Sequence, residues 1–171
     1  GEELNIYEDI FSNSLTGHLT LQDSYNLPQY LPFIGEETID CSIALEGVLS
    51  DTGGSKIIKP PLFHVHDLSD RFLKTPKSQR YSLDLVSEQY MSNLHTKVSK
   101  SYEGVFASPS DIVEDIWSNY LDDTNDLWVE QTLRTDQVVI PNWHPHDVFN
   151  WLAARATSAD DDAAHNYLYF E

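Results

Sequence analysis

The chain has 171 residues, 40% of them apolar, and its 28 Asp and Glu against 10 Lys and Arg give a formal net charge of −18. This charge argues against tight nucleic-acid binding, which depends on Lys and Arg, and against attachment to an anionic membrane surface. Because Cys41 is the single cysteine, no internal disulfide can form, which excludes a small secreted disulfide scaffold.

The first half of the chain predicts antiparallel strands. Apolar and polar residues alternate over residues 4–23, on either side of Ser12-Asn13-Ser14, and this pattern is typical of a hairpin. Two prolines within residues 27–32 predict a loop or a short helical turn, because proline cannot donate to a strand ladder. A third strand is predicted over Ile39–Leu45, with Cys41 as a small buried residue on it.

Two more strands are predicted after a flexible loop at residues 50–55. The first covers Leu62–Leu68, a turn covers Lys74–Ser78, and the second, Tyr81–Leu85, has the clearest alternation in the chain. Short strands at this near-regular spacing indicate an antiparallel barrel or sandwich.

The second half predicts helices mixed with strands. Ser108, followed by Pro109 and Asp111, is typical of a helix start, and apolar residues then recur at helical spacing as far as Leu121. The further elements predicted along the chain are strands at 127–133 and 137–140, a helix from Pro145 with His144 at its cap, an exposed loop at 157–164 and a final strand at 167–171. Trp117 and Trp151 lie on the apolar faces of the two helices, so both are predicted to be buried.

These elements predict a mainly β fold with an α+β second part. We place the change of character near residues 88–100, with an antiparallel β-barrel over residues 1–94 and an α+β domain over residues 95–171. No apolar run approaches the ~20 residues of a membrane span, so no membrane anchor is predicted. The chain begins at Gly1 without Met and ends in strand-like sequence, and we therefore expect it to be part of a longer polypeptide.

Two segments share the pattern His-x-His-Asp, which is the best candidate for a metal site. On a strand, His64 and His66 would point to one face, and two imidazoles at that spacing suit zinc. The pattern offers no third ligand, and His144 and His146 lie at a helix start. Paired histidines on a solvated strand and a helix cap are the better interpretations, so no metal and no cofactor is predicted.

The sequence also contains no established catalytic pattern. Glycine-rich phosphate loops, nucleophile elbows and His-Glu-x-x-His are all missing, and Cys41 has no helix terminus nearby to activate it. Acidic runs such as Asp122-Asp123 and Asp160-Asp161-Asp162 are expected in a chain with 28 acids and are interpreted as solvated. We therefore predict that the chain is not an enzyme and has no catalytic residues.

In order along the chain, several segments resemble the central baseplate-hub protein of T-even-type contractile-tailed phages. The resemblance covers most of the chain, and its strength lies in the order of the segments. These are Ile6–Asn13, Leu15–Gly17, Leu19–Asp23, Leu31–Glu37, Phe63–His66 running into Ser69–Arg71, Ser78–Leu83, Ser110–Val113, Ile140–Trp143 and Asn150–Ala153.

The resemblance implies a structural role in the virion. Hub proteins of this family form homotrimers, and each subunit carries two barrels like the tail-tube protein, so that three subunits form a sixfold-like ring. The ring joins the hexameric tail tube to the trimeric central spike in the tail baseplate, and it is assembled in the host cytoplasm. On this basis residues 1–94 would be the first tube-like barrel, and residues 95–171 would be part of an inserted domain, which we expect to be truncated.

Two other interpretations remain open. One is the spike-base domain of a type VI secretion system, which shares the tube-like barrel; the other is a ligand- or carbohydrate-binding β-module, which would show an exposed aromatic platform. In the hub interpretation DNA passes through the ring without specific binding. Three chains would bring 3 × −18 = −54 formal charges to the ring, with Asp40, Glu46 and Asp84 as candidate channel-lining acids.

Overall fold

The computed structural model describes residues 3–30, 34–49, 55–103, 108–121, 126–133, 137–161 and 163–171. The chain divides into two compact units, each described here by itself. Unit 1 comprises residues 1–7 and 15–88, and unit 2 comprises residues 8–14 and 89–171. The mainly β class with an α+β second part is confirmed, while the domain ranges 1–94 and 95–171 stay predictions.

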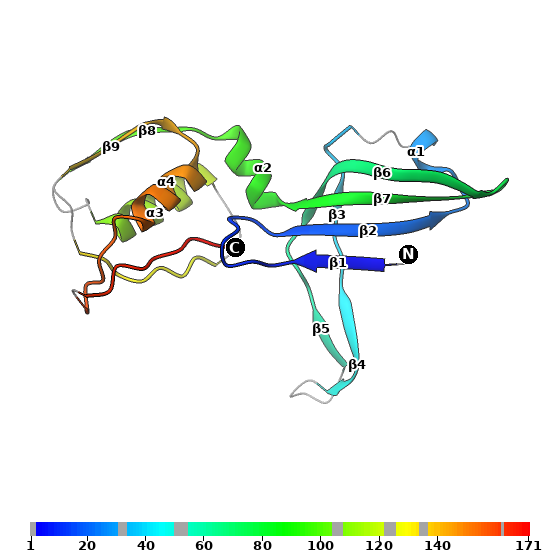
Figure 1. The fold of residues 1–171 in the computed structure, drawn as a ribbon, viewed down its shortest axis with the longest axis horizontal. Helices are drawn as coiled ribbons and strands as arrows, with labels where there is room; N and C mark the ends of the chain where they lie inside the picture. Colours follow the sequence, from blue (N-terminus) through cyan, green and yellow to red (C-terminus); the bar gives the residue numbers. More distant parts are fainter. Residues whose placement is uncertain are drawn as a thin grey trace. The chain divides into compact units, whose positions relative to one another are not determined.

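Unit 1 is built on a curled, five-stranded antiparallel sheet with the order β1-β2-β7-β6-β3 (Figure 1). It forms a half-barrel and not a closed barrel within the described residues. Its strands are β1 (Glu3–Tyr7), β2 (Thr16–Asp23), β3 (Thr38–Ile39), β6 (Phe63–Thr75) and β7 (Ser78–Ser87). The predicted hairpin of residues 4–23 is confirmed as β1 and β2, and the predicted turn near Lys74–Ser78 joins β6 to β7.

Three smaller elements complete unit 1. The residues after β2 form the short helical turn α1 (Leu27–Tyr30), and β4 (Ile43–Leu49) pairs with β5 (Ser55–Ile58) as a separate two-stranded ribbon. The single strand predicted over Ile39–Leu45 is wrong, because the chain leaves the ladder between β3 and β4. Cys41 lies in this break and is half-buried, not a buried strand residue. The predicted loop at residues 50–54 and the motif residues 31–33 lie outside the described residues.

The apolar core residues of unit 1 alternate along its strands, and polar residues between them, such as Thr20 and Ser82, are buried as well. One face of the sheet carries the buried cluster, and the polar residues of the same strands point to the other face. Gly17 belongs to the close contact between β1, β2 and β7, because a Cβ there would lie 3.2 Å from the backbone oxygen of Asn5. The cluster consists of Phe63, Val65, Tyr81, Leu83 and Leu85.

Unit 2 combines helices with a two-stranded antiparallel sheet. In chain order it contains α2 (Glu88–His95), which begins at the last residue of unit 1, then β8 (Val98–Glu103), α3 (Pro109–Ile116), the π-helical turn η2 (Trp117–Leu121), β9 (Gln137–Trp143) and α4 (Pro145–Ala153). The helix start at Ser108 is confirmed, since its side chain accepts from the backbone N–H of Asp111. The strands predicted at 127–133 and 167–171 are wrong: the first forms only a bridge from Thr132 to Ser158, and the second is irregular.

In the core of unit 2, side chains of α3, η2 and α4 pack against those of β8 and β9. Trp117 is 8% exposed within it, so its predicted burial is confirmed. Trp151 is only half-buried, and that prediction is wrong: it lies at the rim of the core, 5.8 Å edge-on from Trp143 and 4.2 Å from the guanidinium of Arg155. The fully enclosed side chains of this core include Val98, Ile112, Ile116, Ile140, Val148, Phe149 and Leu152.

Candidate functional site

The open edges of the unit 1 sheet are its first functional feature. Within the described residues β1 pairs with β2 alone, so its outer side presents unpaired backbone N–H and C=O groups along five residues. The opposite edge, β3, pairs with β6 over only two residues. An exposed strand edge is a template for pairing with another chain, so β1 is a candidate assembly edge.

The apolar face of this sheet becomes less covered toward the same edge. The cluster members on β6 and β7 are enclosed, whereas Leu4 and Ile6 on β1 and Leu19 and Leu21 on β2 are only half-buried. Partly covered apolar side chains beside an open strand edge are typical of a surface that another chain completes.

The other face of the sheet carries a line of hydrogen-bonded polar groups. Thr20 and Ser82 lie 3.2 Å apart through their hydroxyl oxygens, and His18 Nδ1 lies 2.8 Å from Asp84 Oδ1. The hydroxyl of Ser69 donates to the second oxygen of Asp84, at 3.4 Å. Although Ser, His and Asp meet here, the serine contacts the carboxylate and not the imidazole, so the histidine is not placed to activate it.

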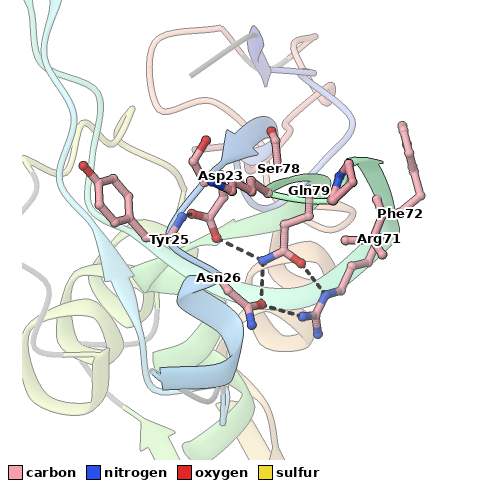
Figure 2. A pocket seen from close by; sticks show the side chains of 11 residues that line it. Asp23, Tyr25, Asn26, Arg71, Phe72, Ser78 and Gln79 are labelled. Atoms are coloured by element: carbon pink, nitrogen blue, oxygen red, sulfur yellow. Dashed lines mark hydrogen bonds between the residues drawn. The ribbon is translucent and has the colours of Figure 1, made fainter.

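A depression of about 580 Å³ lies beside the turn end of the hairpin formed by β6 and β7 (Figure 2). Its centre is Gln79, whose amide nitrogen donates to Asp23 Oδ2 at 3.1 Å and to Asn26 Oδ1 at 2.8 Å. Arg71 closes the network: its Nε donates to Gln79 Oε1 and its Nη2 to Asn26 Oδ1, both at 2.9 Å. The guanidinium is thus held by two neutral amides, which fix its direction.

Asp23 anchors the turn that carries Asn26. Its carboxylate accepts from the backbone N–H groups of Tyr25 and Leu27, each at 2.6 Å. Burial raises the pKa of Asp23, but these hydrogen bonds and the one from Gln79 outweigh it and hold the pKa below its ordinary value. Asn26 has φ +58°, a left-handed conformation that asparagine adopts more readily than most non-glycine residues.

The two predicted histidine pairs differ in their placement. His64 and His66 both lie on β6, but a β-bulge falls between Val65 and Asp67, so the pairing register shifts at His66 and the alternation is broken. The pair therefore does not form the regular i, i+2 face that the sequence predicts. His64 is half-buried and His66 is exposed.

His144 and His146 serve the start of α4. His144 occupies the N-cap position, as predicted, and its Nδ1 lies within 2.9 Å of the backbone oxygens of Asn93 and Thr96. His146 is buried, and its backbone N–H donates to Asn93 Oδ1 at 2.8 Å. Burial lowers the pKa of His146 to about 4, with a further contribution from His144.

Among the described residues, no three His, Cys, Asp or Glu side chains gather as a metal site would require. The absence of a bound metal stays a prediction. Asp122 and Asp123 lie outside the described residues, as does Asp162, while Asp160 and Asp161 are exposed. No helix in the described part of the chain is long and apolar enough to cross a membrane.

The candidate channel acids are not equivalent. Asp40 is exposed, whereas Asp84 is half-buried and engaged by His18 and Ser69. The side chain of Glu46 lies outside the described part of the structure. Asp40 is therefore the best placed of the two described acids to act on a passing charge.

Sequence analysis missed the network around Gln79 altogether. Asp23 and Gln79 are 56 residues apart in the sequence, and no local pattern indicates that they are in contact. One signal was present in the sequence: Arg71, Lys74, Lys77 and Arg80 gather in ten residues of a strongly acidic chain.

Comparisons with known protein families and with curated proteins find no match. Among solved structures, the chain is similar to the crystal structure of a 43 kDa tail protein of prophage MuSo2 from Shewanella oneidensis, with a TM-score of 0.51 and 14% sequence identity. The likeness covers 89% of this chain and 44% of that protein, so the chain spans less than half of its length. At this identity the likeness is one of fold: the chain shares its fold with part of a prophage tail protein.

Proposed function

We propose that this chain is a non-enzymatic structural component of a phage tail and that it acts in the baseplate hub. There it would adapt the hexameric tail tube to the trimeric central spike, as part of a homotrimer. The observation that carries the proposal is the shared fold with the MuSo2 tail protein over 89% of the chain. The order of hub-like segments in the sequence supports the finer assignment to the hub.

The open sheet of unit 1 supports an assembly role. A half-barrel with an unpaired edge at β1 and half-buried apolar side chains beside it can be completed by a strand or sheet from another chain. In the proposed ring, neighbouring barrels supply that cover, and the polar face with Thr20, Ser82 and Asp84 is turned away from it.

The charge of the chain fits a ring through which DNA passes. Lys or Arg on a channel wall would hold phosphates, whereas carboxylates repel them. Only acids within about a Debye length of the channel, about 8 Å at physiological salt, would act on the DNA. Asp40 is the candidate that the described residues favour.

An amber mutation in the gene that encodes this chain tests the proposed function. In a non-suppressing host, the lysate should contain filled heads and no complete tails under the electron microscope. Supplying the chain from a plasmid should restore complete tails and infectivity. Normal tails and normal infectivity in the non-suppressing host would contradict the structural role.

A further inference from the structure

Positive charge is concentrated in one segment of this acidic chain. Residues 71–80 contain Arg71, Lys74, Lys77 and Arg80 and no acid, so the segment carries +4. The rest of the chain therefore carries −18 − 4 = −22 formal charges, with only six Lys and Arg against 28 acids. Residues 71–80 are therefore positively charged, whereas the rest of the chain is on balance strongly negative.

The fold places this segment on an exposed hairpin. It runs from the end of β6 through the turn at Pro76 and Lys77 into the start of β7. A β-bulge between Ser69 and Phe72 turns the outer part of the strand, and the exposed Asp70 within it has φ +50°. Phe72 is 51% exposed and Leu73 is 75% exposed, so the hairpin presents apolar side chains together with its cations.

The depression behind the hairpin adds a shaped, polar pocket to this surface. Arg71 is fixed there by Gln79 and Asn26, and Gln79 itself is 5% exposed and tied to Asp23 (Figure 2). Tyr25 and Phe72 lie on opposite sides of the network, and they do not form the continuous aromatic platform expected of a sugar-binding module. An oriented Arg beside exposed aromatic side chains is typical of the core of a protein interface.

We propose that the β6–β7 hairpin and its depression dock onto an acidic surface of a second copy of this chain. Charge complementarity supports this partner: two chains of −18 repel each other except where residues 71–80 of one, which carry +4, meet the −22 remainder of the other. A nucleic acid is the competing polyanion, and the oligonucleotide experiment below distinguishes it from a second copy.

The inference deepens the proposed function, since both require copies of the chain to assemble, but the two can fail separately. The amber mutant tests the place of the chain in the tail. The hairpin is tested with the purified 171-residue chain by sedimentation at low and high salt. Two doubly substituted variants with the same net charge are compared: Lys74→Glu/Lys77→Glu in the hairpin, and Lys59→Glu/Lys97→Glu at exposed lysines outside it.

The wild-type chain should self-associate, and less so at about 1 M than at about 0.15 M ionic strength. At about 0.15 M the Debye length of about 8 Å already screens the repulsion between the net charges of the two chains, and at about 1 M its fall to about 3 Å weakens the contacts of the hairpin as well. The hairpin variant should need about tenfold or more higher concentration to associate, whereas the control should stay near the wild type. A milder variant, Lys74→Gln/Lys77→Gln, should fall between the two. Far-UV circular dichroism checks that every variant folds.

Three results would overturn the inference. One is a wild-type chain that stays monomeric at both salt concentrations. Another is equal weakening in the hairpin and control variants, which would assign the effect to net charge alone. The third is binding of a DNA oligonucleotide that the wild type shows and the hairpin variant loses, which would assign the hairpin to phosphates. In each case the amber mutant can still support the tail function.

Discussion

The buried imidazole of His146 should make the stability of unit 2 depend on pH. The side chain is 6% exposed and lies 5.3 Å from the ring of Tyr169 and 6.4 Å from that of Phe149. Within the described residues its Nε2 has no hydrogen-bond partner. Removal from water disfavours the charged form, and the pKa falls from 6.5 to about 4.

The sign of the effect follows from proton binding. As the pH falls, the unfolded chain takes up the proton near pH 6.5, while the folded chain resists protonation until about pH 4. The stabilisation is therefore fully present above pH 6.5 and is lost as the pH falls toward 4. With these two pKa values, linkage gives a loss of about 2 kcal/mol between about pH 7.5 and about pH 5, and about 3 kcal/mol at about pH 4.

Urea unfolding followed by tryptophan fluorescence measures this loss selectively. All four tryptophans lie in unit 2, so their fluorescence reports on that unit. With a urea dependence of about 2 kcal/mol per molar, the midpoint should fall by about 1 M between about pH 7.5 and about pH 5. The lower limit avoids the region near the sequence pI of about 4.4, where the chain is least soluble.

His146→Gln is the matched variant, because glutamine is polar and does not titrate in this range. The urea midpoint of the variant should be lower than that of the wild type at neutral pH. Its change between about pH 7.5 and about pH 5 should be much smaller than in the wild type. Parallel pH dependence in the wild type and in the variant would refute the reasoning.

Three further predictions concern packing, an ion pair and the proposed channel. Trp117→Ala should destabilise unit 2 by about 3–5 kcal/mol in chemical unfolding, and Trp151→Ala by clearly less, because it lies at the rim of the core; equal costs would contradict the burial. Asp115→Asn should lower the free energy of unfolding by about 1–3 kcal/mol. The reason is that Asp115 accepts from Lys100 Nζ at 2.7 Å and from the hydroxyl of Tyr102 at 2.6 Å. An unchanged unfolding midpoint would count against this prediction. Asp40→Lys in an intact phage should slow genome ejection at low salt without impairing assembly, and unchanged ejection kinetics would reject a channel role.

Elements with a local signal were predictable from the sequence. Ser108 and Pro109 set the start of α3, because a cap and a proline act within one helical turn. The alternation in β7 was equally reliable, since Tyr81, Leu83 and Leu85 all belong to the buried cluster and a shift by one residue would turn them away from it.

Elements that depend on distant partners were not predictable. The alternating segments at 127–133 and 167–171 suggest strands but find no ladder to join, and alternation alone cannot reveal this. Helix α2 was missed because it buries the polar side chains Gln89 and Asn93, so it lacks an apolar periodicity. The network of Asp23 and Gln79 was missed for the same reason: tertiary contacts create it.

We propose that this chain is built into the axis of a phage tail at the baseplate. A cryo-electron-microscopy map of the tail end of intact particles tests it most directly. The account predicts density on the tail axis, between tube and spike, into which the five-stranded sheet of unit 1 fits, with a neighbouring chain along β1. A map in which the ring between tube and spike is fully explained by other chains, with unit 1 fitting nowhere on the axis, would contradict it.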